Sequence, residues 1–114
     1  MKVIYVAGKY RDSRGEYYVR ENIRLAEAAS IFVWQSGGVP LCPHKNAAFL
    51  GGVEGTSDST WLVGDLELLT RCDAIWAIEN WHDSFGAKAE VEFAKSKNIP
   101  VLFNRDDVIK FLAD

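Results

Sequence analysis

The sequence has no surplus of positive charge. Thirteen Lys and Arg residues stand against sixteen Asp and Glu residues, for a formal net charge of −3. A nucleic-acid polymer is therefore not an expected partner, because binding a phosphate backbone requires a basic surface. A small anionic ligand stays open, since one arginine and a helix N-terminus are enough to bind it.

Long hydrophobic runs are also absent, and the longest apolar stretches are far too short to span a bilayer. Residues 2–7 look like a strand and not like a secretory signal, so we expect none. The only cysteines are Cys42 and Cys72, whose spacing matches neither a disulfide framework nor a metal site. We expect two reduced thiols in a cytoplasmic protein.

The composition is that of an ordinary globular domain. With 114 residues, 48% of them hydrophobic and 25% charged, we expect one folded domain over residues 1–114. A core this small gains from association with a second copy. Phe49 and Leu50 in a long loop also suggest an interface, so a homodimer or higher homo-oligomer is expected.

Short apolar runs alternate with helical periods along the chain. The expected strands cover residues 3–7, 39–42, 74–78 and 99–103, and the expected helices cover 17–35, 60–71, 86–97 and 105–113. Strand–helix alternation predicts an α/β fold with a doubly wound, Rossmann- or flavodoxin-like parallel sheet flanked by helices. Right-handed crossovers give about four strands in the order 2-1-3-4.

In such a sheet, ligands bind beyond the carboxyl ends of the strands. The segments there are 8–11, 43–46 and 79–90, and residues 43–59 form a loop long enough to be functional. A dinucleotide-binding domain is disfavoured, because no G-x-G-x-x-G follows the first strand.

Two acidic residues fall on helix faces that should be buried. Asp65 lies three residues after Leu62 and four before Leu69, and Glu90 lies in the same way within the apolar stripe of helix 86–97. A buried carboxylate is costly unless it is paired or hydrogen-bonded. The pair therefore indicates either a site at one sheet edge or two local contacts, for example to Arg11.

Glu92 and Glu67 provide the contrast. Glu92 lies four residues after Lys88 and three before Lys95, which is typical of a solvated ion-pair face. Glu67 is likewise expected at the surface. Two carboxylates at one cleft, in comparison, are the side chains that glycosidic-bond cleavage uses.

The order and spacing of several motifs are more specific. They are Tyr5-Val6-Ala7-Gly8 with Tyr10-Arg11, Cys42-Pro43-His44-Lys45-Asn46, Gly64-Asp65-Leu66-Glu67 with Asp73, and Ser84-Phe85-Gly86 through Glu90. Through these segments nearly the whole chain resembles the nucleoside 2-deoxyribosyltransferase superfamily, which includes 2'-deoxynucleoside 5'-phosphate N-hydrolases.

The resemblance implies chemistry at an N-glycosidic bond, with a small-molecule nucleoside or nucleotide as ligand. It implies that Glu90 is the nucleophile, that Asp65 assists the leaving base and that Tyr5 lines the sugar pocket. Ser84 matches the position that holds the 5' end. A hydroxyl at a helix N-terminus suits a phosphate, so Ser84 favours a 5'-monophosphate.

The other binding residues come from the same segments. Gly8 allows close backbone approach, Arg11 is a candidate phosphate contact, and Lys9 stands where many relatives have proline. Three more expected contacts are Tyr10, Asn46 and Gly86. His44 is either a hydrogen-bonded structural group or a ligand contact, and both alternatives stay open.

No metal or organic cofactor is expected, because His44 and His82 are the only histidines and no acidic spacing accompanies them. Trp81 is expected either to stack on a base or cover the cleft, or to pack at a dimer contact. Larger superfamily members add a strand and a C-terminal tail after the fourth strand, so we expect a less complete phosphate site here. The alternative function is a non-catalytic nucleotide-binding or nucleotide-sensing module that uses the same pocket.

Overall fold

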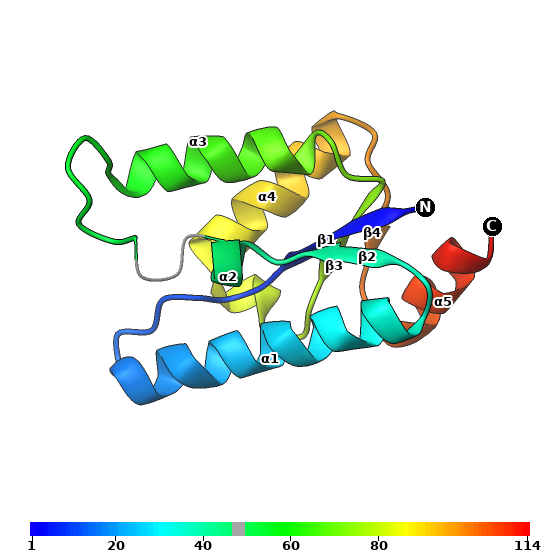
Figure 1. Cartoon of the computed structure of the whole chain (residues 1–114), viewed down its shortest axis with the longest axis horizontal. Coiled ribbons are helices and arrows are strands. Elements are labelled where there is room, and N and C mark those ends of the chain that lie inside the picture. The colour runs from blue at the N-terminus through cyan, green and yellow to red at the C-terminus, as the bar shows by residue number, and fades with distance from the viewer. Residues whose placement is uncertain (47–49) are drawn as a thin grey trace.

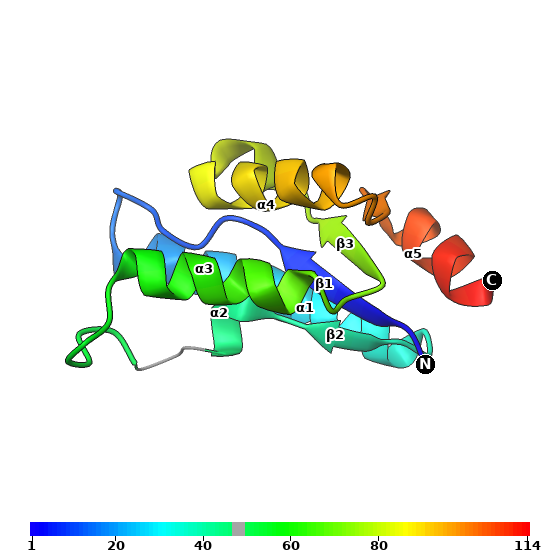
Figure 2. The same ribbon diagram turned by 90° about the horizontal axis from the view of Figure 1, so that it is seen from above.

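A four-stranded parallel sheet lies at the centre of the fold, with helices on both faces (Figures 1 and 2). The computed structural model describes residues 1–46 and 50–114. The strands are β1 (Val3–Ala7), β2 (Val39–Leu41), β3 (Ala74–Ala77) and β4 (Val101–Leu102). Their order is β2-β1-β3-β4 and every pair is parallel, which confirms the predicted fold class and strand order.

Five α-helices and one short 3-10 helix are seen in the described part of the chain. They are α1 (Glu16–Gln35), α2 (Pro43–Asn46), α3 (Asp58–Leu69), η1 (Trp81–Asp83), α4 (Phe85–Ser96) and α5 (Arg105–Ala113). The single turn of α2 was not predicted and lies within the expected loop. Phe49, in the same expected loop, lies outside the described residues.

Two of the element boundaries that differ from the prediction have clear local reasons. Helix α3 begins earlier, because Ser57 is its N-cap and the backbone N–H of Ser57 donates to Thr60 Oγ1 at 3.0 Å. Strand β4 is shorter, because the backbone N–H of Ile99 still bonds to the carbonyl at the end of α4.

The side chains of β1 alternate between two separate cores. Ile4 and Val6 face α1 and α5, whereas Tyr5 and Ala7 face α3 and α4. Figure 1 shows α3 and α1 on opposite sides of the sheet. The two cores are therefore built by neighbouring residues of one strand.

The buried stripe of α1 includes one polar residue. Asn22 is buried together with Ala26, Ala29 and Val33, whereas Leu25 is 38% exposed. Asn22 turns inward because its side-chain amide donates to the carbonyl of Tyr10 at 3.1 Å. Helix α1 thus supports the loop that follows β1.

Two further expectations concern membranes and cysteines. None of the helices in the described ranges combines the length and apolar character that a membrane crossing requires. Cys42 and Cys72 are both free thiols, with Cys72 buried.

Candidate functional site

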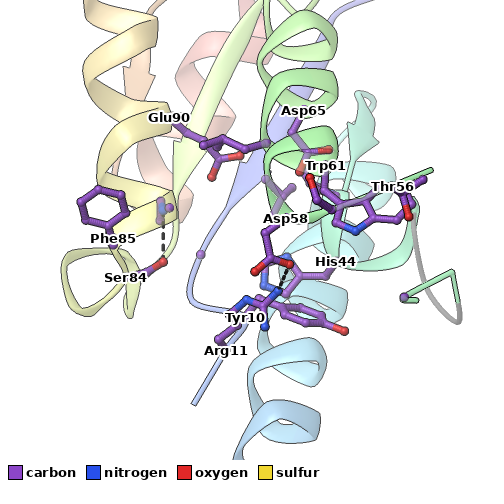
Figure 3. Close-up of a pocket in the computed structure, with 18 of the residues that line it drawn as sticks. Tyr10, Arg11, His44, Thr56, Asp58, Trp61, Asp65, Ser84, Phe85 and Glu90 are labelled. Carbon is purple, nitrogen blue, oxygen red and sulfur yellow. Dashed lines mark hydrogen bonds and ion pairs between the residues drawn. The ribbon is translucent and has the colours of Figure 1, made fainter. Parts of the chain in front are cut away.

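A cavity of about 600 Å³ opens at the carboxyl ends of the strands, between α3 and α4 (Figure 3). Its volume is that of a small-molecule site. Eight of the predicted site residues line it: Gly8, Tyr10, Arg11, His44, Asp65, Ser84, Gly86 and Glu90. The topology therefore brings segments from most of the chain to one edge of the sheet, as predicted.

Glu90 is the buried carboxylate of this cavity. Helix α4 packs Ala87, Val91 and Ala94 against the sheet, and the same face carries Glu90, which is only 8% exposed. Burial raises its pKa to about 7, opposed by a hydrogen bond from Tyr5 and assisted by the negative charge of Asp65.

Tyr5 of β1 is the hydrogen-bond partner of Glu90. Its side chain is fully buried, and its hydroxyl donates to Glu90 Oε2. Burial and the adjacent Glu90 charge raise the pKa of the Tyr5 hydroxyl far above its usual range, so it stays a donor. Tyr5 is absent from the cavity lining and reaches the site only through this contact.

Asp65 enters the same cavity from α3. It is half-buried, and burial raises its pKa to about 6. Figure 3 shows Asp65 and Glu90 extending from different helices into one space. Both helix faces were predicted to point inward, and the structure confirms this orientation for the two carboxylates.

Ser84 is the N-cap of α4. Its Oγ accepts a hydrogen bond from the backbone N–H of Ala87 at 3.1 Å, which leaves the hydroxyl proton available to a ligand. The first backbone N–H groups of a helix have no partner within the helix. Ser84, Phe85 and Gly86 all line the cavity, so this helix end offers several donors to it.

The loop after β1 is held by three side chains from distant segments. The carbonyl of Lys9 accepts from His44 Nε2 at 2.9 Å, its N–H donates to Asn80 Oδ1 at 2.9 Å, and Asn22 anchors Tyr10. Asn80 and Asn22 also bond to each other at 3.4 Å. Neither asparagine was predicted, because their proximity depends on the sheet topology.

Gly8 is required by packing at this loop. A Cβ there would lie 2.6 Å from the Ile78 side chain and 2.9 Å from Asn80 Oδ1. Both contacts are too close for any residue but glycine without a local shift. Gly8 therefore lets the loop reach Asn80, besides lining the cavity.

The structural alternative for His44 is now visible. Its ring is buried, donates to the Lys9 carbonyl and lies edge-on to Tyr10 with 5.4 Å between ring centroids. Burial lowers its pKa, which favours the neutral ring. His44 also lines the cavity, so a ligand contact remains compatible with this structural role.

Two predicted cations form ion pairs, and not all of the predicted residues line the cavity. Arg11 pairs with Asp58 of α3 at 2.5 Å, and Lys9 pairs with Asp12 at 3.5 Å. Lys9 contributes no cavity lining, and Asn46 lies in a separate hollow between α1 and β2. The second hollow shares none of the lining residues of the first.

Sequence reasoning missed part of the α3 wall. Asp58 and Trp61 line the cavity together with Asp65. Their spacing of three and four residues places all three on one helix face. Asp58 lies outside the predicted helix 60–71, whereas the helix in the structure begins at this residue.

Trp81 is partly buried and does not line the cavity, so it does not cover it. It packs against the core on the α3/α4 side and lies 5.9 Å from the Phe103 ring. Glu92 and Glu67 behave as predicted: Glu92 pairs with Lys95 at 3.6 Å, and Glu67 pairs with Arg71 at 3.2 Å, all at the surface.

No group of three or more His, Cys, Asp or Glu side chains within residues 1–46 and 50–114 is arranged to bind a metal ion. The residues that line the cavity include carboxyl groups, hydroxyls and the backbone donors of a helix end.

A family model for a domain of unknown function, DUF7768, matches residues 2–104. The chain belongs to the DUF7768 family. The match spans all four strands and every residue that lines the cavity. The chain matches none of the curated proteins with which it was compared.

Three solved structures share the fold of this DUF7768 chain. A 2-deoxyribosyltransferase from Bacillus psychrosaccharolyticus has a TM-score of 0.65 and 22% identity, covering 87% of this chain and 69% of its own. A 2-deoxyribosyltransferase from Leishmania mexicana has 0.65 and 20%, covering 90% and 63%. A conserved protein from Enterococcus faecalis has 0.64 and 24%, covering 89% and 61%.

These similarities establish the expected resemblance at the level of the fold. The chain spans about two thirds of the length of each of the three proteins. At such identities the fold alone is shown, and function has to be argued from the site.

Proposed function

We propose that this protein cleaves or transfers the N-glycosidic bond of a nucleoside, a deoxynucleoside or a 5'-monophosphate of either. The observation that carries the proposal is the buried Glu90 carboxylate, held by Tyr5 and facing Asp65 in a cavity of small-molecule size. The fold shared with two 2-deoxyribosyltransferases supports it.

Glu90 would act as the nucleophile. The Tyr5 hydroxyl occupies Oε2, which leaves Oε1 to attack the anomeric carbon of the sugar. One C–O bond forms to Glu90 while the C–N bond to the base breaks, with the electron pair leaving on the base. Water or a second base then displaces the sugar from Glu90.

Asp65 would assist the departing base from the opposite wall. With a pKa of about 6, part of the Asp65 population still holds a proton near neutrality and can donate it to a base nitrogen. The ionised fraction can instead accept hydrogen bonds from the base. Ser84 and the first N–H groups of α4 would hold the 5' end of the sugar.

Incubation with a panel of nucleosides and 5'-monophosphates, followed by chromatography, tests the proposal through release of free base. We expect Glu90→Gln to reduce release by roughly 10³-fold or more. Glu92→Gln is the matched control, because it makes the same change two residues away on the exposed face of α4.

Undiminished base release by the Glu90→Gln variant would contradict the mechanism. If the folded wild-type protein binds ligands from the panel and releases no base from any of them, the protein is a nucleotide-binding module that uses the same cavity.

A further inference from the structure

The guanidinium of Arg11 already has an anionic partner. Arg11 comes from the loop after β1 and Asp58 from the first turn of α3, and their side chains meet at 2.5 Å across the cavity wall (Figure 3). The two side chains are 74% and 79% exposed, so they meet at the open side of the cavity. Arg11, the cation best placed for an anionic ligand, thus already forms an ion pair with Asp58.

The remaining charges of the cavity are negative. Four carboxyl groups line it, namely Asp58, Asp65, Asp83 and Glu90, of which burial keeps Asp65 and Glu90 partly protonated near neutrality. Among the described lining residues, Arg11 alone carries a fixed positive charge. The other nearby cation, Lys9, is turned to Asp12, whose carboxylate is 2% exposed and already bonded to Arg14.

This charge balance acts on the 5' end of a ligand. A phosphate monoester carries nearly two negative charges at neutral pH, and it would enter a cavity with a surplus of carboxylates. Asp83 directly precedes Ser84, the residue expected to hold that end. A 5'-hydroxyl brings no charge and can use the same donors, so it avoids this repulsion.

We propose that Asp58 makes the cavity selective for the unphosphorylated nucleoside, by pairing with Arg11 and adding negative charge to the cavity wall. The inference rests on the proposed function and narrows its substrate class. Ser84 considered alone favours a 5'-monophosphate, but one hydroxyl and a helix end compete with several carboxylates.

The test compares kcat/KM for a deoxynucleoside and for its 5'-monophosphate. We expect the wild-type protein to prefer the nucleoside, and Asp58→Asn to shift the ratio toward the monophosphate by about three- to tenfold. Glu67→Gln is the control, because this exposed carboxylate of α3 pairs with Arg71 away from the cavity.

A second variant and a double variant exclude a merely structural effect. Asp83→Asn removes a different cavity carboxylate and should shift the ratio in the same direction. In an Arg11→Ala background, Asp58→Asn should shift the ratio less, because there is no guanidinium to release. An unchanged ratio in both Asp58→Asn and Asp83→Asn, or a wild-type preference for the monophosphate, overturns the inference.

Calorimetric binding to the Glu90→Gln variant separates this inference from the proposed function. Preferred binding of the nucleoside, together with no base release by the wild type, supports the selectivity and overturns only the enzymatic proposal. Preferred binding of the monophosphate overturns the selectivity. Binding of neither ligand overturns both.

Discussion

The two faces of the sheet are built from the same strands but differ in what they bury. On the α1/α5 face, Ile4, Val6 and Trp76 pack into a hydrophobic core, and the buried polar side chain of α1, Asn22, is uncharged and hydrogen-bonded. On the α3/α4 face, Tyr5 of the same strand lies beneath Glu90 and beside the cavity. One face is covered by hydrophobic packing, and the other buries an ionisable carboxyl group, Glu90, beside the cavity.

The difference shows where the fold gains and loses stability. Apolar burial on the α1/α5 face stabilises the domain at every pH. Burial of Glu90 opposes its ionisation, so the α3/α4 face becomes less stable as this carboxyl loses its proton. Substitutions on the two faces should therefore differ in pH dependence as well as in size.

The largest effect on stability is expected on the α1/α5 face. Ile4→Ala removes a fully buried side chain and should lower the free energy of unfolding by about 2–5 kcal/mol, equally at acid and alkaline pH. Denaturant unfolding measures it. Ile31→Ala, at a 54% exposed position of α1, should change the same quantity by less than about 0.5 kcal/mol.

A smaller effect with a pH dependence is expected at Glu90. Its pKa is about 7 in the folded protein and 4.5 ordinarily, so the folded state holds the proton more tightly. The resulting penalty is absent below the lower value, grows between the two values and is complete above the higher one. Glu90→Gln removes it, and should be more stable than the wild type above pH 7 by about 2–3 kcal/mol.

Unfolding curves for the wild type and Glu90→Gln at about pH 5 and about pH 8 measure this difference. The Asp65 carboxyl remains in both proteins, so its own titration largely cancels. Glu92→Gln should keep the wild-type pH dependence, because its carboxylate is exposed. A Glu90→Gln advantage of equal size at both pH values would show that charge burial is not the cause.

The smallest effect is expected at the Tyr5 hydroxyl, which donates a hydrogen bond to Glu90. The Tyr5 hydrogen bond lowers the pKa of Glu90, so Tyr5→Phe should raise it. The rising limb of kcat/KM against pH, which requires ionised Glu90, should then move upward by about one pH unit.

Tyr17→Phe removes a hydroxyl from a 65% exposed ring and should leave the limb in place. A Tyr5→Phe variant with lower activity and an unmoved limb would assign Tyr5 to packing alone.

Much of the fold was predictable because its signals are local. Strand runs, helical periods and right-handed crossovers predicted the parallel order. The inward direction of Asp65 and Glu90 followed from helix periodicity, which depends only on spacing within each helix. Helix periodicity does not predict the burial of Asn22, whose side-chain amide donates to the distant carbonyl of Tyr10.

Contacts between distant residues were not predictable in the same way. Tyr5 and Glu90 are 85 residues apart, Asn22 and Asn80 are 58 apart, and Arg11 and Asp58 are 47 apart. No local pattern encodes such pairs. They form because strand order and helix placement bring separate segments to one edge of the sheet.

The sequence by itself determined which residue types stand at each strand end and which helix faces carry the two acids. These properties are periodic, and chain geometry alone converts them into direction. Only the tertiary structure decided that Tyr5 supports Glu90 and that Asp58 occupies Arg11. Those pairings depend on how the layers pack, and they set both the protonation of the nucleophile proposed here and the charge that a ligand meets.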